Sequence, residues 1–94
     1  MLAVARALVR RPKLLILDEP LEGLAPRIAT AIIDVLKSVR NEGVSIFITE
    51  SGSLARVKGL VDVAYGIDRG EIVYKGPLDG IERSEEARRR IWGF

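Results

Sequence analysis

Cysteine and histidine are both absent from the 94 residues of this chain. Without cysteine there is no disulfide scaffold, no thiolate metal site and no cysteine nucleophile. Without histidine there is neither the commonest general base nor one of the common metal ligands. Any acid–base or metal chemistry must therefore rest mainly on carboxylates, lysine, tyrosine and hydroxyl groups.

Long apolar stretches and a strong charge imbalance are missing as well. The longest apolar runs are four or five residues, well below the roughly 18 residues of a membrane-spanning helix, and no signal peptide is recognisable at the start. Fifteen basic residues are balanced by thirteen acidic ones, giving a net charge of +2. This balance gives no reason to expect a nucleic-acid partner or direct insertion into a membrane. We therefore expect a cytoplasmic α/β chain that forms at most one small domain.

Strand-like and helix-like segments alternate along the chain. Four short apolar runs predict strands: Leu14–Leu17, Val44–Thr49, Asp62–Ile67 and Glu71–Lys75. The first two runs show no polar alternation, which is typical of strands buried on both faces of a parallel sheet. The last two runs are joined by the tight turn Asp68-Arg69-Gly70, with Gly70 expected at positive φ, so they should form an antiparallel hairpin.

Helical spacing fills the remaining segments. Helices are predicted over residues 2–10, from Pro26 to a stop at 41–43, from a Ser53 cap through Leu60, and from Ser84 onward. A helix between two strands predicts parallel pairing with a crossover connection. In the last helix we interpret Arg88-Arg89-Arg90 as a solvated face, and Trp92 and Phe94 as packing anchors.

Two adjacent carboxylates, Asp18 and Glu19, directly follow the first predicted strand. Open α/β sheets bind their ligands at the carboxyl ends of strands. Asp18 suits Mg²⁺, which favours one or two carboxylates together with phosphates and waters. Glu19 suits the role of orienting or deprotonating an attacking water. The alternative is that Asp18-Glu19-Pro20 only ends a strand in a solvated turn, but four aliphatic residues directly before the pair favour a functional site.

The segment LLILDEP at residues 14–20 resembles the Walker B motif, with its following glutamate, of the ATP-binding subunits of ABC transporters. Further matching segments are AVARAL at 3–8 (the helix after the signature motif), LEGLAP at 21–26 (the D-loop), GVSIFITE at 43–50 (the strand before the switch loop) and DRGEIVYKG at 68–76 (a late hairpin). The resemblance covers residues 2–75. The GLAP sequence is most similar to the branched-chain amino acid transport subgroup.

This resemblance implies that residues 1–94 are the C-terminal fragment of an ABC ATPase domain, which is a P-loop NTPase. Such an intact domain binds ATP and Mg²⁺ and hydrolyses ATP to drive solute transport. It works with transmembrane transporter subunits at the inner face of the cell membrane. The resemblance assigns metal binding to Asp18 and catalysis to Glu19, and it places Glu50 at the position of the switch histidine.

Several family elements have no counterpart in these residues. The sequence contains no Gly-rich P-loop with its Lys and Ser/Thr, no signature motif and no Q-loop, all of which lie upstream in the family. We therefore expect the isolated chain to bind no cofactor and to be inactive. Glu50 is an anion where the family has histidine, and its alternative role is a solvated residue after a strand. Ala25 replaces the D-loop aspartate, and Leu21 replaces a usual serine.

Two other functions are open from the sequence. The chain could be a catalytically inert remnant that keeps the fold, or a small α/β interaction module whose Asp18 and Glu19 bind a cation. In the family's sheet the P-loop strand lies between the strands matching residues 44–49 and 62–67. Because no such strand is present here, we expect unpaired strand edges and a homo-oligomer.

Overall fold

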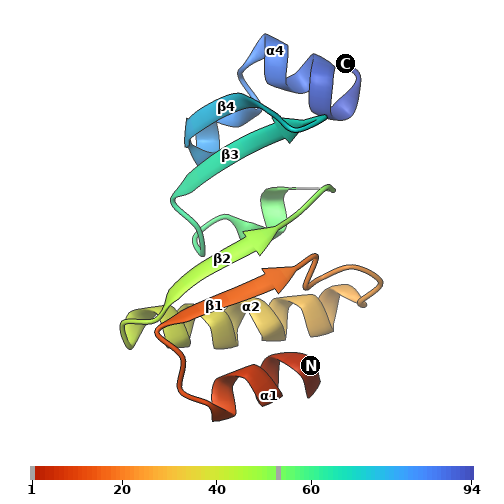
Figure 1. Cartoon of the computed structure of the whole chain (residues 1–94). Coiled ribbons are helices and arrows are strands. Elements are labelled where there is room, and N and C mark those ends of the chain that lie inside the picture. Colours follow the sequence, from red (N-terminus) through yellow and green to blue (C-terminus); the bar gives the residue numbers. More distant parts are fainter. Residues whose placement is uncertain (1, 53) are drawn as a thin grey trace. The chain divides into compact units, whose positions relative to one another are not determined.

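The computed structural model describes residues 2–52 and 54–94. These residues form two compact units, Met1–Leu60 and Val61–Phe94, whose elements are labelled in Figure 1. None of the described helices is long and apolar enough to cross a membrane. Ser53, the predicted helix cap, lies outside the described residues.

The first unit follows the predicted strand–helix–strand order. Its elements are α1 (Leu2–Val9), β1 (Leu14–Asp18), α2 (Pro26–Asn41), β2 (Ser45–Thr49) and the short 3₁₀ helix η1 (Leu54–Val57). The strands β1 and β2 pair in parallel, in a register that runs from Leu14 opposite Ser45 to Asp18 opposite Thr49. This pairing confirms the expected crossover through α2.

The limits of α2 follow from its terminal residues. Pro26 occupies the first turn, where its missing N–H is not needed for an intrahelical hydrogen bond. At the other end, the Gly43 N–H donates to the Arg40 carbonyl at 2.9 Å, and Gly43 adopts a φ of 100°. The sequence therefore predicted both ends of this helix correctly.

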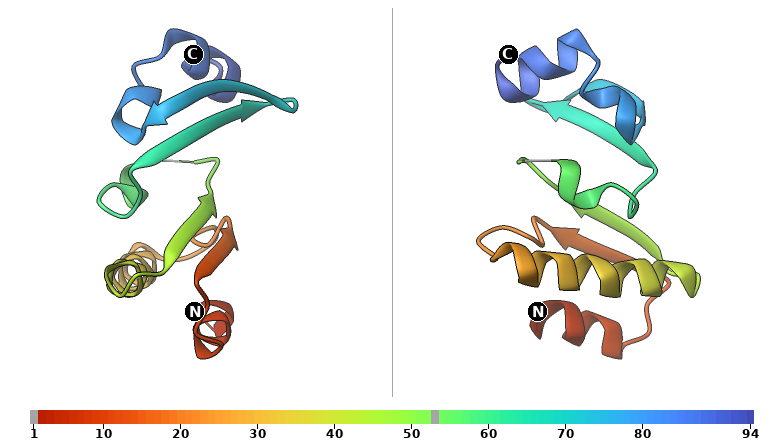
Figure 2. Two further views of the ribbon diagram at one scale, coloured as in Figure 1. Left: turned by 60° about the vertical axis from the view of Figure 1, so that its left-hand side comes forward. Right: turned by 180° about the vertical axis from the view of Figure 1, so that it is seen from behind.

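Only one face of the β1–β2 pair is covered. The helix α2 lies against that face (Figure 2), and the core of the unit consists of Leu15, Leu21, Ala29, Ile32, Ile33, Leu36, Val57 and Leu60. On the opposite face, Leu14, Ile16 and Phe47 are 52%, 65% and 56% exposed. The prediction that both strands are buried on both faces is therefore wrong for the described residues, because a single helical layer covers them.

The second unit begins with the predicted hairpin. Its elements are β3 (Val63–Asp68), β4 (Glu71–Pro77), α3 (Leu78–Ile81), α4 (Glu85–Ala87) and the π-helical turn η2 (Arg88–Trp92). The strands β3 and β4 are antiparallel. Arg69 and Gly70 have φ values of 51° and 77°, the two positive angles of a tight hairpin turn that matches the strand twist.

The C-terminal segment agrees only in part with its prediction. Ser84 caps α4 as expected, since its Oγ accepts a hydrogen bond from the Ala87 N–H at 3.3 Å. Arg90, however, pairs with Asp68 and Glu71, so a fully solvated arginine face is wrong at this position. Phe94 is 75% exposed, and only the half-buried Trp92 qualifies as a packing anchor.

Candidate functional site

The parallel register brings two polar strand ends together. Asp18 ends β1, and its register partner Thr49 ends β2. The Thr49 hydroxyl donates a hydrogen bond to Asp18 Oδ1. This contact fixes one carboxylate oxygen at the carboxyl edge of the sheet, where α/β sheets place their ligands.

Glu19 is held at the same edge through its backbone. Its N–H donates to the Thr49 carbonyl at 3.2 Å and to Thr49 Oγ1 at 3.0 Å. Glu19 adopts a φ of 48°, a left-handed conformation that few residues other than glycine and asparagine adopt without strain. The chain therefore turns sharply directly after the strand. The side chain of Glu19 no longer follows the pattern in which successive strand side chains point to opposite faces of the sheet.

The donor set fits Mg²⁺ only as part of a larger site. One oxygen of Asp18 is engaged by Thr49, and in the part of the chain that the structure describes its other oxygen accepts no hydrogen bond. When Mg²⁺ is bound to nucleotide phosphates, the protein commonly supplies only one or two carboxylate ligands. Residues 2–52 and 54–94 hold no group of three or more acidic side chains that could bind a metal by themselves.

The loop between Glu19 and α2 is anchored by an apolar side chain. Leu21 is fully buried, so this residue packs in the core and does not add an apolar group to the site. Ala25 stands at the N-terminus of α2 and provides no side-chain cap. From η1, the Arg56 guanidinium donates to the Leu21 carbonyl at 3.4 Å, a long contact that ties the loop to the segment after β2.

Glu50 follows β2 at the same edge but binds its own turn. Its Oε1 accepts a hydrogen bond from the Gly52 N–H at 3.0 Å. Its Oε2 is buried and has no hydrogen-bond partner among the described residues. Because this oxygen is buried and the residue is half-buried, Glu50 is not the freely solvated residue of the alternative interpretation.

Thr49 is the residue that the sequence reasoning missed. Its hydroxyl bridges the Asp18 carboxylate and the Glu19 backbone. A usable signal was present, because parallel strands of matched length place their last residues side by side. Aligning Leu14–Asp18 with Ser45–Thr49 would have brought Thr49 to Asp18.

No protein-family model matches the chain. Among known proteins, however, its relatives include several transport ATP-binding proteins. The chain is 47% identical to the high-affinity branched-chain amino acid transport ATP-binding protein BraG of Pseudomonas aeruginosa over 73 residues. These residues are 78% of this chain and 31% of BraG. It is 39% identical over 85 residues to the lantibiotic transport ATP-binding protein SrtF of Streptococcus pyogenes, covering 90% of this chain and 37% of SrtF. It is 33% identical over 81 residues to the arginine transport ATP-binding protein ArtP of Haemophilus influenzae, covering 85% and 32%.

The chain thus spans about a third of the length of these relatives. Over most of its length, the chain is homologous to the ATP-binding proteins of ABC transporters.

Proposed function

We propose that residues 1–94 are the C-terminal part of an ABC ATPase domain, a partial P-loop NTPase fold that contains the Walker B, D-loop and switch-loop region. The observation that supports this best is the edge of the β1–β2 pair, where Asp18 and Glu19 are both tied to Thr49. In the complete domain these side chains would act on ATP and Mg²⁺ together with a P-loop contributed by other residues.

Asp18 is the proposed metal ligand and Glu19 the proposed catalytic carboxylate. In such a domain Mg²⁺ neutralises charge on the nucleotide phosphates. The Thr49 hydrogen bond orients the Asp18 carboxylate toward the site, and the turn at Glu19 separates its side chain from that of Asp18. Glu19 would orient the attacking water and accept its proton.

The isolated chain should neither turn over ATP nor bind a cofactor. Phosphoryl transfer depends almost entirely on positioning and electrostatic stabilisation, and these residues hold no Gly-rich P-loop. Mg²⁺ alone should bind weakly, because one or two carboxylates offer too few ligands without nucleotide phosphates. A micromolar Mg²⁺ affinity in calorimetry without nucleotide would contradict this part of the proposal.

The catalytic assignment is tested by joining residues 1–94 to the upstream half of an ABC ATPase domain that carries a P-loop. We expect ATP hydrolysis by this chimera and its loss in Glu19→Gln. Glu22→Gln is the matched control, since Glu22 is an exposed glutamate three residues further along the loop. A chimera that folds, binds ATP and loses no activity in Glu19→Gln would refute the assignment.

Glu50 should weaken such a chimera. We propose that it occupies the switch-histidine position, where a negative charge replaces a hydrogen-bond donor beside the transferred phosphoryl group. Removing one donor of this kind costs about 3–4 kcal/mol in other enzymes. Glu50→His should therefore raise turnover, and equal turnover of the two forms would show that Glu50 is not at that position.

For the transported solute, we propose branched-chain amino acids. The support is the GLAP sequence at residues 23–26 and the likeness to BraG. The partners would be transmembrane transporter subunits, with the chain in the cytoplasm at the inner face of the membrane, and a second copy of the chain. Solute uptake by cells that express the complete protein with its membrane subunits would test the substrate, and uptake of an unrelated solute alone would refute it.

A further inference from the structure

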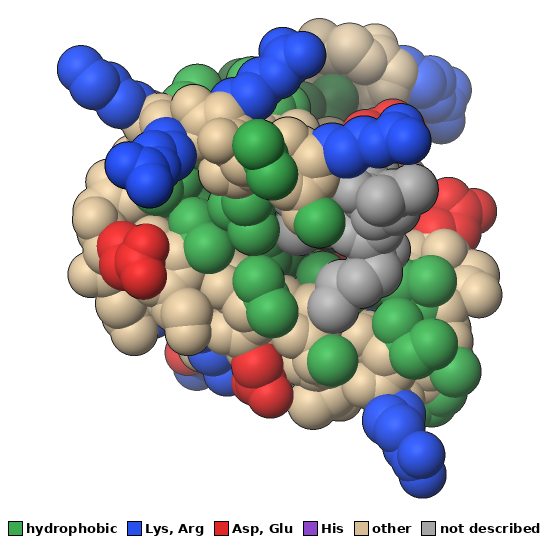
Figure 3. Space-filling view, turned by 90° about the horizontal axis from the view of Figure 1, so that it is seen from below, with side chains coloured by type: hydrophobic (Ala, Val, Ile, Leu, Met, Phe, Trp, Pro, Cys, Tyr) green, Lys and Arg blue, Asp and Glu red, His purple; other side chains and the backbone are tan. Residues whose placement is uncertain are grey.

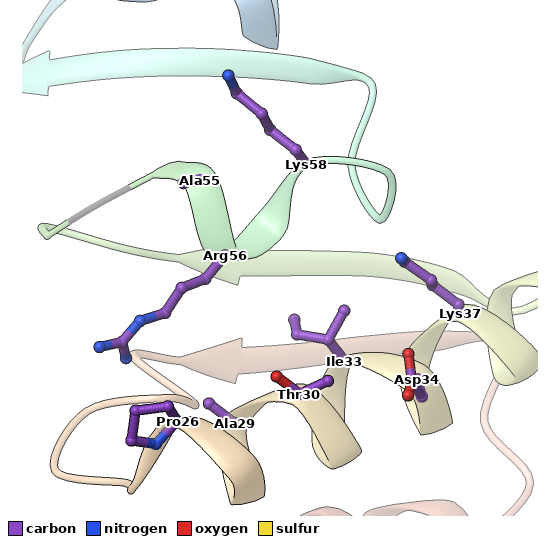
Figure 4. Close-up of a pocket in the computed structure, with 9 residues that line it drawn as sticks. All are labelled: Pro26, Ala29, Thr30, Ile33, Asp34, Lys37, Ala55, Arg56 and Lys58. Atoms are coloured by element: carbon purple, nitrogen blue, oxygen red, sulfur yellow. The ribbon is translucent and has the colours of Figure 1, made fainter.

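A groove runs between α2 and η1, apart from the Asp18–Glu19 edge. It is an open hollow of about 320 Å³, at the lower end of the range of pockets that bind small ligands. Its lining, drawn in Figure 4, consists of Pro26, Ala29, Thr30, Ile33, Asp34, Lys37, Ala55, Arg56 and Lys58. All of these residues belong to the first unit.

The groove has an apolar floor with a cation at each end. Ala29 and Ile33 are 4% and 6% exposed and form the floor. Figure 4 shows the Arg56 guanidinium beside Pro26 at one end. At the other end, Lys37 Nζ lies 3.3 Å from the point where a Cβ on Gly59 would stand.

The two cations stand near opposite ends of the groove (Figure 4). Pro26 and Lys37 are eleven residues apart on α2, which corresponds to about 16 Å along a helix axis. An extended peptide covers that distance with about five residues. A chain segment can thus pair with both cations and still place one side chain on the floor.

We propose that this groove binds an extended acidic segment of a partner protein. Two carboxylates about five residues apart would pair with Arg56 and Lys37, and an apolar side chain between them would pack on Ala29 and Ile33. Asp34 and Thr30 stand on the rim between the ends and can accept hydrogen bonds from the peptide N–H groups. The Lys58 ammonium points away from α2 in Figure 4 and is not needed. This inference is independent of the proposed ATPase role.

The test titrates the full 94-residue chain into a fluorescein-labelled peptide, Glu-Ala-Leu-Ala-Ala-Glu, and follows the fluorescence anisotropy. We expect saturable binding that weakens as salt is added, because exposed ion pairs are screened. Arg56→Glu and Lys37→Glu should each lower the affinity about fivefold or more. Replacing the peptide's leucine with serine should also weaken binding.

Arg27→Glu is the matched control. Arg27 is an exposed cation on the same helix but is not part of the groove lining, so the substitution makes the same change in net charge. An equal loss of affinity in Arg27→Glu would overturn the proposal in favour of unspecific charge attraction, and so would the absence of saturable binding. Complete displacement of the peptide by equimolar glutarate would assign the site to a small dicarboxylate and would also overturn it. Circular dichroism confirms that each variant is folded.

Discussion

Glu19 combines a proposed chemical role with an unfavourable backbone conformation. Its φ of 48° lies in the left-handed region, which costs an ordinary residue roughly 1–2 kcal/mol. Two hydrogen bonds from its N–H to Thr49 hold it there. Strain of this kind concentrates at sites where geometry serves function, so stability and activity should oppose each other at this residue.

Glu19→Asn should therefore stabilise the chain. Asparagine adopts the left-handed region more readily than glutamate, and we expect the free energy of unfolding to rise by up to about 1 kcal/mol in urea denaturation. Glu22→Asn is the control, because Glu22 is exposed and does not have a positive φ. If both substitutions change stability equally, the conformation of Glu19 carries no strain.

The residues of the candidate site were predictable to different degrees. Asp18 and Glu19 were identified because a run of four aliphatic residues ends at them. Thr49 was missed because its role depends on strand register, which joins residues 31 positions apart. The buried Oε2 of Glu50 could not be foreseen either, since burial of a polar atom after a strand depends on how the following turn folds.

At the scale of elements, Arg90 of η2 forms ion pairs with the β3–β4 hairpin. Its guanidinium contacts Asp68 at 3.0 Å and Glu71 at 2.8 Å, and it lies 3.7 Å from Glu86. The hydrogen bond from Arg90, followed by its positive charge, holds the pKa of Glu71 below the ordinary value of 4.5. A lowered folded-state pKa stabilises the fold above the unfolded-state pKa, and this stabilisation disappears as the pH falls through the folded-state pKa.

Arg90→Gln should remove this pH dependence. Wild-type stability should decline as the pH falls below about 4.5, and the variant should be less stable at pH 7 but show a shallower decline in acid. The fluorescence of Trp92, the single tryptophan, reports unfolding from within η2. Arg89→Gln is the control, because Arg89 is exposed and has no ion pair among the described residues. Identical acid profiles for Arg90→Gln and wild type would contradict the role of Arg90.

Close packing of η2 on β3 leaves little room for a side chain at Gly66. A Cβ at Gly66 would lie 2.8 Å from Ile91 Cδ1 and 3.3 Å from Ile81 Cδ1. Gly66→Ala should therefore destabilise the chain by about 1–3 kcal/mol. Adding Ile91→Val removes the clashing methyl group and should recover part of this loss, so the two substitutions should be non-additive in urea denaturation. Strict additivity would mean that the two side chains do not meet.

The sequence predicted the elements well where proline, glycine or turn residues mark their ends. Pro26 and Gly43 mark the ends of α2, and Arg69-Gly70 forms the predicted hairpin turn. The short helix α3 was not predicted, and the helix predicted from Ser84 onward was not expected to take a π-helical form at η2. They depend on packing against the hairpin, where Leu78, Ile81 and Ala87 are buried, and single-sequence periodicity does not reveal that packing.

On the scale of the whole molecule, several large apolar side chains are exposed on the strands of both units. Leu14, Ile16 and Phe47 share the bare face of the β1–β2 pair, and Ile67 and Ile72 are 61% and 59% exposed on the hairpin. Figure 3, the view from below, shows hydrophobic side chains among charged ones on the side that it draws. The relatives are about three times as long as the matched region, so this exposure is consistent with a surface that further protein covers.

Self-association is therefore expected when the chain is studied alone. The strands β1 and β2 form a sheet of only two strands, so each has an outer edge without a strand partner among the described residues. Such an edge beside an apolar face favours pairing with a second copy. Light scattering at low micromolar concentration should give a mass above the 10.4 kDa of one chain. Phe47→Glu should shift the population toward the monomer, because a charge on the bare face opposes its burial.

Ile28→Glu is the matched control for that experiment. Ile28 is 45% exposed but belongs to α2, so the same charge is added away from the bare strand face. We expect Ile28→Glu to leave the association unchanged. A cooperatively unfolding monomer of 10.4 kDa would show that two strands and one helical layer suffice for a stable chain. Equal dissociation by both variants would place the contact elsewhere, because of these two residues Phe47 lies on the bare face of the β1–β2 pair and Ile28 does not.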